Sequence, residues 1–164
     1  MRTLGYDVNV EEFVTHMRAG VENFLSSDEE LAKWLASVKH RKVIFTNTRE
    51  CEAKKALECL GISKYFDKVY GADFMDGDCK PSEAVFTKVL ADCGAAPMDS
   101  VMFADSMRNV VTAHGLGMRT VFIRGKDPEQ GVGEASGGAP DKVIDVAVDF
   151  VAQLSPENAP WLFD

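Results

Sequence analysis

Apolar residues recur at two different spacings along the chain. From residue 10 to residue 25 they return every three or four positions, which is typical of one face of an amphipathic helix. The same spacing returns from residue 31 to residue 38, so we predict two helices before any strand. Asn9 with Glu12, and Ser27 with Glu30, have the spacing of capping boxes, which places the helix starts there.

After residue 38, short apolar runs alternate with helical patterns. The runs predict strands at residues 42–46, 69–70, 101–104, 119–123 and 143–144. Helical spacing predicts helices over residues 53–60, 82–90, 109–114 and 148–154, and a Gly-rich stretch predicts a surface loop at 125–139. Such alternation is typical of an α/β fold with a mostly parallel sheet. We therefore expect a helical element at residues 1–38 and an α/β core at residues 39–164.

Composition and charge narrow the class of protein. The 164 residues are 46% hydrophobic and 27% charged, which is the profile of a globular protein with a buried core. The net charge is −8, so we expect neither a nucleic-acid polymer nor an anionic membrane as partner. We see no signal-peptide pattern and no long apolar stretch, and we expect a cytoplasmic protein. The cysteines form no C-x-x-C pair, and we interpret them as free thiols, with Cys51 and Cys59 buried or half-buried on one helix.

Polar residues stand where the predicted strands end. Thr46 and Asn47 close one strand, Asp105 follows another, and Lys80 precedes a helix between them. Ligands of parallel sheets bind outside the carboxyl ends of the strands. A hydroxyl and an ammonium can hold phosphoryl oxygens, and a carboxylate can hold Mg²⁺. Each feature alone usually has only a local structural role, but their combination predicts a phosphate and metal site.

In this order, the segments resemble the second, third and fourth motifs of the haloacid dehalogenase (HAD) superfamily. They are Phe45-Thr46-Asn47, Cys79-Lys80-Pro81-Ser82 and residues 103–109. Thirty-four residues separate Thr46 from Lys80, and 25 separate Lys80 from Asp105. The branch that they resemble most is that of the pyrimidine 5′-nucleotidase-like phosphatases. The resemblance runs from about Gly5 to about Ile123, and it implies a HAD-like Rossmannoid core preceded by part of a helical cap at residues 1–38.

The resemblance also implies a role for each polar residue. Thr46 would bind the transferring phosphoryl group with support from Asn47, and Lys80 would neutralise charge on the nucleophile and the phosphate. Asp105 would ligate Mg²⁺, and Asn109 would orient Lys80 or a metal-bound water. The expected substrate is a nucleotide or a small phosphorylated metabolite.

One motif of the superfamily is missing. Its members begin with a strand that ends in D-x-D-x-T or D-x-D-x-V, in which the first Asp is the nucleophile and the second is the general acid and base. The segments Asp7-Val8-Asn9, Asp76-Gly77-Asp78 and Asp145-Val146-Ala147 do not fit, because each lacks the second Asp or the preceding strand. Without that strand, the neighbouring strands 42–46 and 101–104 would stand about 10 Å apart, which is two strand spacings. We expect a fragment of a longer protein, a direct pairing of the two edges, or a strand received from a second copy or a partner.

Two interpretations stay open. The first is an Mg²⁺-dependent phosphomonoesterase that is incomplete and inactive without its nucleophile and that binds Mg²⁺ weakly through one carboxylate. The second is a non-catalytic pseudoenzyme that binds a phosphate ligand or a protein. A receiver-type signalling domain does not fit, because its acidic pair would lie on the first strand. A dinucleotide-binding domain does not fit either, because Gly131-Val132-Gly133 opens no helix and Ser136 stands where the last glycine would be.

Overall fold

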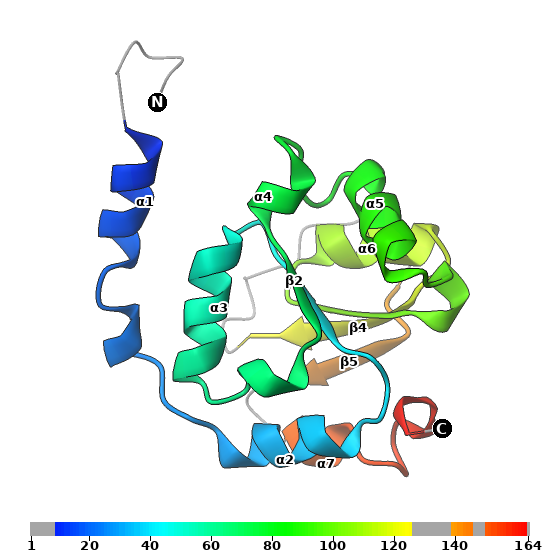
Figure 1. Cartoon of the computed structure of the whole chain (residues 1–164). Coiled ribbons are helices and arrows are strands. Elements are labelled where there is room, and N and C mark those ends of the chain that lie inside the picture. Colours follow the sequence, from blue (N-terminus) through cyan, green and yellow to red (C-terminus); the bar gives the residue numbers. More distant parts are fainter. Residues whose placement is uncertain (1–8, 126–138, 146–149, 164) are drawn as a thin grey trace.

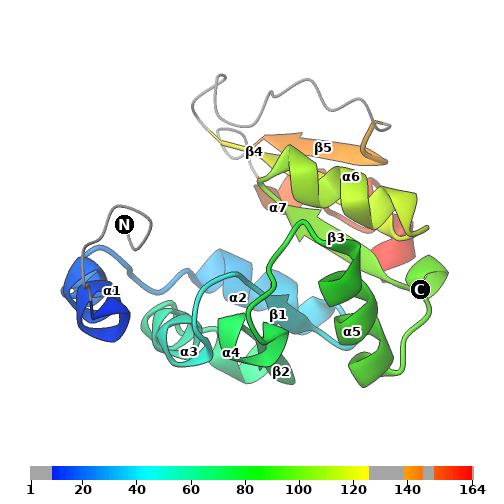
Figure 2. The same ribbon diagram turned by 90° about the horizontal axis from the view of Figure 1, so that it is seen from above.

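The computed structural model describes residues 9–125, 139–145 and 150–163 (Figure 1). The described part contains two parallel sheets. One pairs β1 (Val43–Phe45) with β2 (Lys68–Tyr70). The other has the order β3 (Val101–Ala104), β4 (Arg119–Arg124) and β5 (Lys142–Asp145). Figure 2 shows β1 and β2 apart from the three strands of the second sheet. This arrangement confirms the predicted α/β class with parallel strands.

Helices alternate with these strands as the sequence predicts. The α-helices are α1 (Val10–Arg18), α2 (Glu29–Ser37), α3 (Glu50–Cys59), α4 (Ala72–Met75), α5 (Glu83–Cys93), α6 (Met107–Gly115) and α7 (Phe150–Gln153). Short 3₁₀ turns are η2 (Val21–Asn23), η3 (Ser63–Tyr65), η4 (Pro97–Asp99) and η5 (Pro160–Leu162). Among the described residues, no helix is long and apolar enough to cross a membrane.

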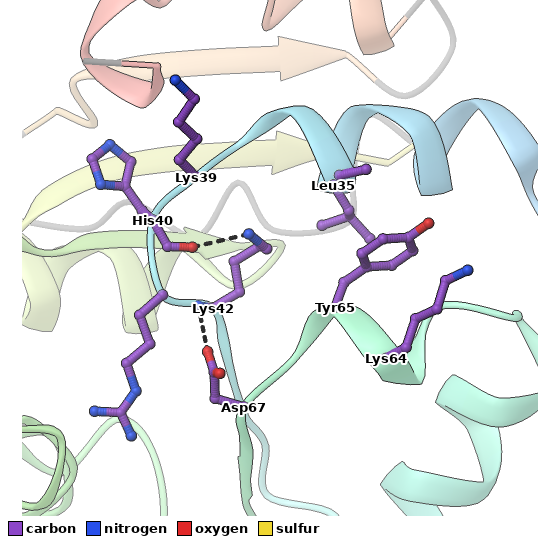
Figure 3. A pocket seen from close by; sticks show the side chains of 9 residues that line it. Leu35, Lys39, His40, Lys42, Lys64, Tyr65 and Asp67 are labelled. Atoms are coloured by element: carbon purple, nitrogen blue, oxygen red, sulfur yellow. Dashed lines mark hydrogen bonds between the residues drawn. The ribbon is translucent and has the colours of Figure 1, made fainter.

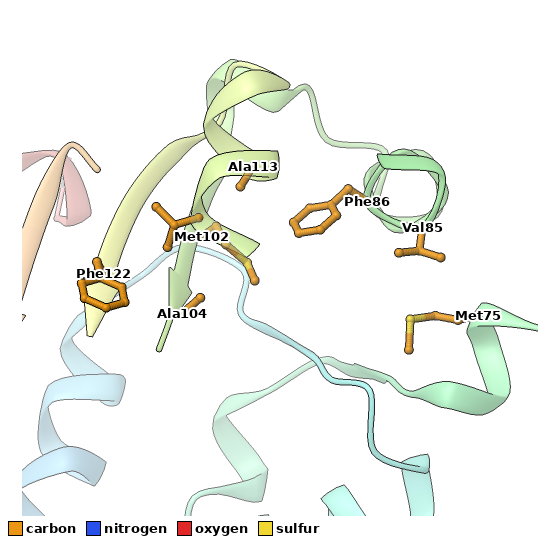
Figure 4. Close-up of a cluster of buried hydrophobic side chains, with 8 residues drawn as sticks. Met75, Val85, Phe86, Met102, Ala104, Ala113 and Phe122 are labelled. Atoms are coloured by element: carbon orange, nitrogen blue, oxygen red, sulfur yellow. The ribbon is translucent and has the colours of Figure 1, made fainter. Parts of the chain in front are cut away.

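Both faces of the second sheet are covered by apolar side chains. Met102 and Ala104 of β3 and Phe122 of β4 face a cluster with residues of α5 and α6, among them the 2% exposed Phe86 (Figure 4). The alternate β4 residue Val121 packs in a second cluster with the C-terminal segment. Because a strand sends successive side chains to opposite faces, covering both faces requires the near-continuous apolar runs seen in the sequence.

A third cluster joins α2 and α3 to the first sheet. Leu35 of α2, Leu57 of α3 and Val69 of β2 are buried together. The indole of Trp34 donates a hydrogen bond of 3.1 Å to the Leu154 carbonyl, and α2 lies beside α7 (Figure 1). Helix α2 is therefore packed on the α/β core, and the division of the chain at residue 38 stays a prediction.

The first helix is shorter than its apolar pattern predicts. Helix α1 ends at Arg18, and the chain then turns through Gly20, whose φ of +83° lies in the left-handed region. Phe24 follows η2 and is 87% exposed, so it is not on the face of one long helix. Figure 1 shows α1 standing away from the sheets. The Asn9 cap is confirmed, because its side chain accepts a bond of 3.2 Å from the Glu12 N–H.

Four further expectations need correction. Asp28 caps α2 in place of Ser27, since its carboxylate accepts the Leu31 N–H at 2.9 Å. Helix α6 begins two residues earlier than predicted, and α4 was not predicted at all. Cys51 is exposed on the outer side of α3, whereas Cys59 is half-buried as expected. The loop at residues 126–138, with Gly131 to Gly133, and the segments of Asp7 and of residues 146–149 lie outside the described residues.

Candidate functional site

The predicted site residues lie after the strands that the sequence named. Thr46 and Asn47 follow β1, Asp105 follows β3, and Lys80 lies in the segment between α4 and α5. The Thr46 N–H donates to the Tyr70 carbonyl at 2.9 Å, which continues the pairing of β1 with β2. The Thr46 hydroxyl accepts the Thr48 N–H at 3.1 Å, so it starts a turn immediately after the strand.

Asn47 is bonded twice to the backbone of Lys80. Its Oδ1 accepts the Lys80 N–H at 2.9 Å, and its Nδ2 donates to the Lys80 carbonyl at 3.1 Å. The two bonds use the acceptor and the donor of one carboxamide, which fixes the side-chain orientation. They join the segment after β1 to the segment before α5, so Asn47 acts on the site by holding Lys80.

The Lys80 ammonium sits at the carboxyl end of β1. It donates a short hydrogen bond to the Phe45 carbonyl and lies 4.8 Å from the centroid of the Phe45 ring. Burial lowers the pKa of Lys80, and the charge of Asp105 opposes that shift in part. Among the described residues Lys80 forms no salt bridge. A half-buried cation without a bound carboxylate is suited to holding an anion.

Asp105 and Asn109 make no hydrogen bond to Lys80 within the described residues. The Asp105 side chain is exposed after β3, near enough to Lys80 for its charge to act there. Asn109 lies in the first turn of α6, where its backbone N–H bonds to the Ser106 carbonyl. No hydrogen bond between Asn109 and Lys80 is present in the described part of the chain, so the proposed orienting role has no contact to support it there.

The segment after β1 is held by residues that the sequence analysis missed. The Asp73 carboxylate accepts the Glu50 N–H at 3.1 Å, and the Ala72 N–H donates to the Thr48 carbonyl at 3.0 Å. A Cβ on Gly71 would lie 2.7 Å from the Thr48 oxygen and from the Glu50 nitrogen. Only glycine permits this approach. The position of Gly71 directly after a strand is the one signal in the sequence that could have indicated this close approach.

The described residues supply some, but not all, of the ligands that Mg²⁺ usually takes. Mg²⁺ takes oxygen ligands, usually one or two carboxylates together with waters and substrate phosphates. Asp105 supplies one exposed carboxylate. No group of three or more His, Cys, Asp or Glu side chains that could hold a metal occurs within residues 9–125, 139–145 and 150–163. The chain's own ligands therefore suit a weakly held ion.

The edges of β1 and β3 that face away from their partners are open. In a parallel strand, the N–H and C=O groups of one residue point to the same neighbouring strand, and the next residue points both groups to the opposite side. From the registers, Val43 and Phe45 face away from β2, and Val101 and Phe103 face away from β4. No described strand pairs with either edge, and the two edges are not paired with each other. The direct pairing that was one expectation is therefore wrong for the described residues.

The comparisons with known proteins decide the family. The model for haloacid dehalogenase-like hydrolases matches residues 5–123. The chain belongs to the haloacid dehalogenase-like hydrolase family. No curated protein matches it.

Solved structures of HAD proteins have the same fold. The L-2-haloacid dehalogenase of Xanthobacter autotrophicus, with chloropropionic acid covalently bound, has 20% identity and a TM-score of 0.68 over 87% of this chain and 65% of that one. The HAD phosphatase of Thermococcus onnurineus has 22% identity and a TM-score of 0.61 over 87% and 63%. A HAD family hydrolase of Deinococcus radiodurans R1, with bound phosphate and sodium, has 17% identity and a TM-score of 0.65 over 83% and 60%. This chain thus spans less than two thirds of the length of these relatives.

Proposed function

We propose that the chain forms the phosphate- and Mg²⁺-binding edge of a HAD-type phosphomonoesterase. The position of Lys80 carries the proposal. Its ammonium is desolvated at the end of β1, beside Thr46 and within the field of Asp105, and it has no described salt bridge. An anion at this edge would offset the loss of hydration that a half-buried cation suffers.

Each residue would then act in a simple way. Lys80 holds and neutralises phosphoryl oxygens, and the Thr46 hydroxyl, which already accepts one hydrogen bond, donates a hydrogen bond to the same group. Asn47 positions Lys80 through the two backbone bonds. Asp105 would hold Mg²⁺, which when bound supplies further positive charge to the phosphate. The substrate class is a nucleotide or a small phosphorylated metabolite.

Phosphate transfer in this scheme needs a carboxylate nucleophile. We propose that the nucleophile is carried by a strand seated between the open edges of β1 and β3, either in a longer form of the protein or in a partner chain. The two open edges support this proposal, because the outward-facing residues of β1 and β3 pair with no other strand in the described part of the chain. The 164 residues alone are then expected to show little or no turnover, since loss of a nucleophile costs on the order of 10⁴–10⁶ in rate.

The phosphatase activity is favoured by two kinds of similarity. The motifs around Thr46, Lys80 and Asp105 resemble those of pyrimidine 5′-nucleotidase-like phosphatases. The Thermococcus onnurineus neighbour is a HAD phosphatase, and the Deinococcus radiodurans neighbour holds phosphate. Pyrimidine nucleoside 5′-monophosphates are therefore the first substrates to test.

The experiment has a binding arm and a turnover arm. Orthophosphate binding to the purified chain is measured by calorimetry for the wild type, for Lys80→Met, and for Lys33→Met as a control at an exposed lysine. We expect binding to be lost only in Lys80→Met. Equal binding by all three proteins would refute the phosphate site.

Turnover of p-nitrophenyl phosphate and pyrimidine nucleotides with Mg²⁺ is then compared for the chain alone and for a fusion that supplies a strand with D-x-D-x-T. We expect activity only in the fusion, and it should disappear in Asp105→Asn. Robust hydrolysis by the 164 residues alone would contradict the missing nucleophile. A well-folded fusion that binds phosphate without turnover would favour the pseudoenzyme instead.

A further inference from the structure

A basic cavity lies at the opposite end of β1 and β2 from the candidate site. It is a depression that is largely open to solvent, with a volume of about 520 Å³, and its lining includes the segment that leads into β1 and the η3 turn that precedes β2. Figure 3 shows Lys39, His40 and Lys42 on one side of it and Lys64 and Tyr65 on the other. Cavities of roughly 300–1,000 Å³ are the size that small organic ligands occupy.

The cavity concentrates positive charge in an acidic protein. Lys39, Arg41, Lys42 and Lys64 line it together with one carboxylate, Asp67, which gives a local net charge of +3 in a chain of −8. A chain with this total charge repels anions on average, so a positive concavity is the place where an anion would gather.

The positive charges are not cancelled by bound carboxylates. The Arg41 guanidinium donates to the Cys93 carbonyl at 3.0 Å, and the Lys42 ammonium donates to the carbonyls of Val38 and, at 2.9 Å, His40. These bonds fix the side chains but leave their charge. Asp67 accepts the backbone N–H of Lys42 at 3.3 Å, and none of the four cations forms a salt bridge in the described part of the chain.

One wall of the cavity is apolar. Leu35 is buried there, and the half-buried Tyr65 presents its ring, with the Lys64 ammonium 5.1 Å from the ring centroid. A ring system could pack on this wall while phosphates reach the lysines across the cavity. A simple inorganic ion would use the charges and leave the apolar wall unused.

We propose that this cavity binds a small organic polyphosphate with a ring system, of the nucleoside triphosphate class. The proposal does not depend on the phosphatase activity, because the cavity lies at the amino ends of the strands. The three residues of β1, about 10 Å of extended chain, separate the cavity from the candidate phosphate site. The small volume favours this ligand over an acidic polypeptide.

The test uses the whole chain and ATP without metal. Every protein in the test carries Lys80→Met, so that the candidate phosphate site does not contribute, and calorimetry compares ATP binding by Lys80→Met alone with binding by the same chain carrying Lys39→Gln/Lys64→Gln. The matched control is Lys33→Gln/Lys54→Gln, which removes the same charge from two exposed lysines outside the cavity. Thermal melting checks that each variant is folded.

We expect Lys39→Gln/Lys64→Gln to weaken ATP binding about fivefold, as for the loss of two exposed ion pairs. The control pair should bind ATP like Lys80→Met alone, and tripolyphosphate should bind more weakly than ATP because it cannot use the apolar wall. Equal weakening by both double variants, or no ATP binding by Lys80→Met at millimolar concentration, would overturn the proposal. Tighter binding of a polyglutamate peptide than of ATP would also overturn it, in favour of a polypeptide ligand.

Discussion

Replacing Asn47 by alanine tests whether its carboxamide holds the Lys80 segment in place. The change removes both hydrogen bonds to the Lys80 backbone, at 2.9 and 3.1 Å. Both bonds are exposed to solvent, so each is expected to contribute about 0.5–1 kcal/mol, the lower part of the usual net range. Asn47→Ala should therefore lower the free energy of unfolding by about 1–2 kcal/mol.

Urea unfolding followed by circular dichroism measures this loss. With a slope of about 2 kcal/mol per molar urea, the midpoint should fall by about 0.5–1 M. The control is Asn23→Ala, at an exposed asparagine in η2 that makes no side-chain hydrogen bond within the described residues. Surface substitutions of that kind change stability by about 0.5 kcal/mol or less. If Asn47→Ala unfolds at the midpoint of Asn23→Ala, the two bonds do not hold Lys80 and the reasoning fails.

Three further changes follow from the packing and the charges. Phe86→Ala removes a ring that is 2% exposed and whose centroid lies 5.0 Å from that of the Phe45 ring. The free energy of unfolding in urea should fall by about 3–5 kcal/mol. A fall below about 1 kcal/mol would contradict this core contact. Burial lowers the pKa of Lys80, so wild-type stability should rise with pH from that lowered pKa to its usual value of 10.5, and Lys80→Met should lack this rise. Hydrogen bonds from Lys68 and Tyr70 lower the pKa of Asp92 below 3.8, so this carboxylate stabilises the fold above pH 3.8 and the contribution is lost as pH falls through the lowered pKa. Asp92→Asn should remove that part of the acid sensitivity, and an unchanged acid unfolding curve would show that the pair contributes nothing.

The sequence predicted the α/β core well because the signal is local. Strands such as β3 carry apolar residues on both faces, and β1, β2 and β3 are each followed within a few residues by a helix. The same holds for the start of α1, where Asn9 and Glu12 are three residues apart and bond as predicted. Patterns that lie within a few residues of one another can be recognised without knowledge of the fold.

Features that depend on distant residues could not be predicted in this way. The Asn47 carboxamide bonds to a residue 33 positions away, and Gly71 matters because the loop of Thr48 and Glu50 approaches it. The end of α1 was missed for another reason. Apolar spacing continues through Gly20 into η2, so the pattern alone does not show that the helix has stopped.

Strands β1 and β4 differ in how deeply their residues are buried. Strand β4 has a partner on each side, and its residues Thr120 to Phe122 are buried. All three residues of β1 are apolar, but among the described strands it has a partner on one side only, and all three residues are only half-buried. Its free edge carries the Phe45 carbonyl, which the Lys80 ammonium now occupies. A segment that covered this edge would extend the sheet and would end beside Lys80 and Thr46, which is where the proposed chemistry needs a nucleophile.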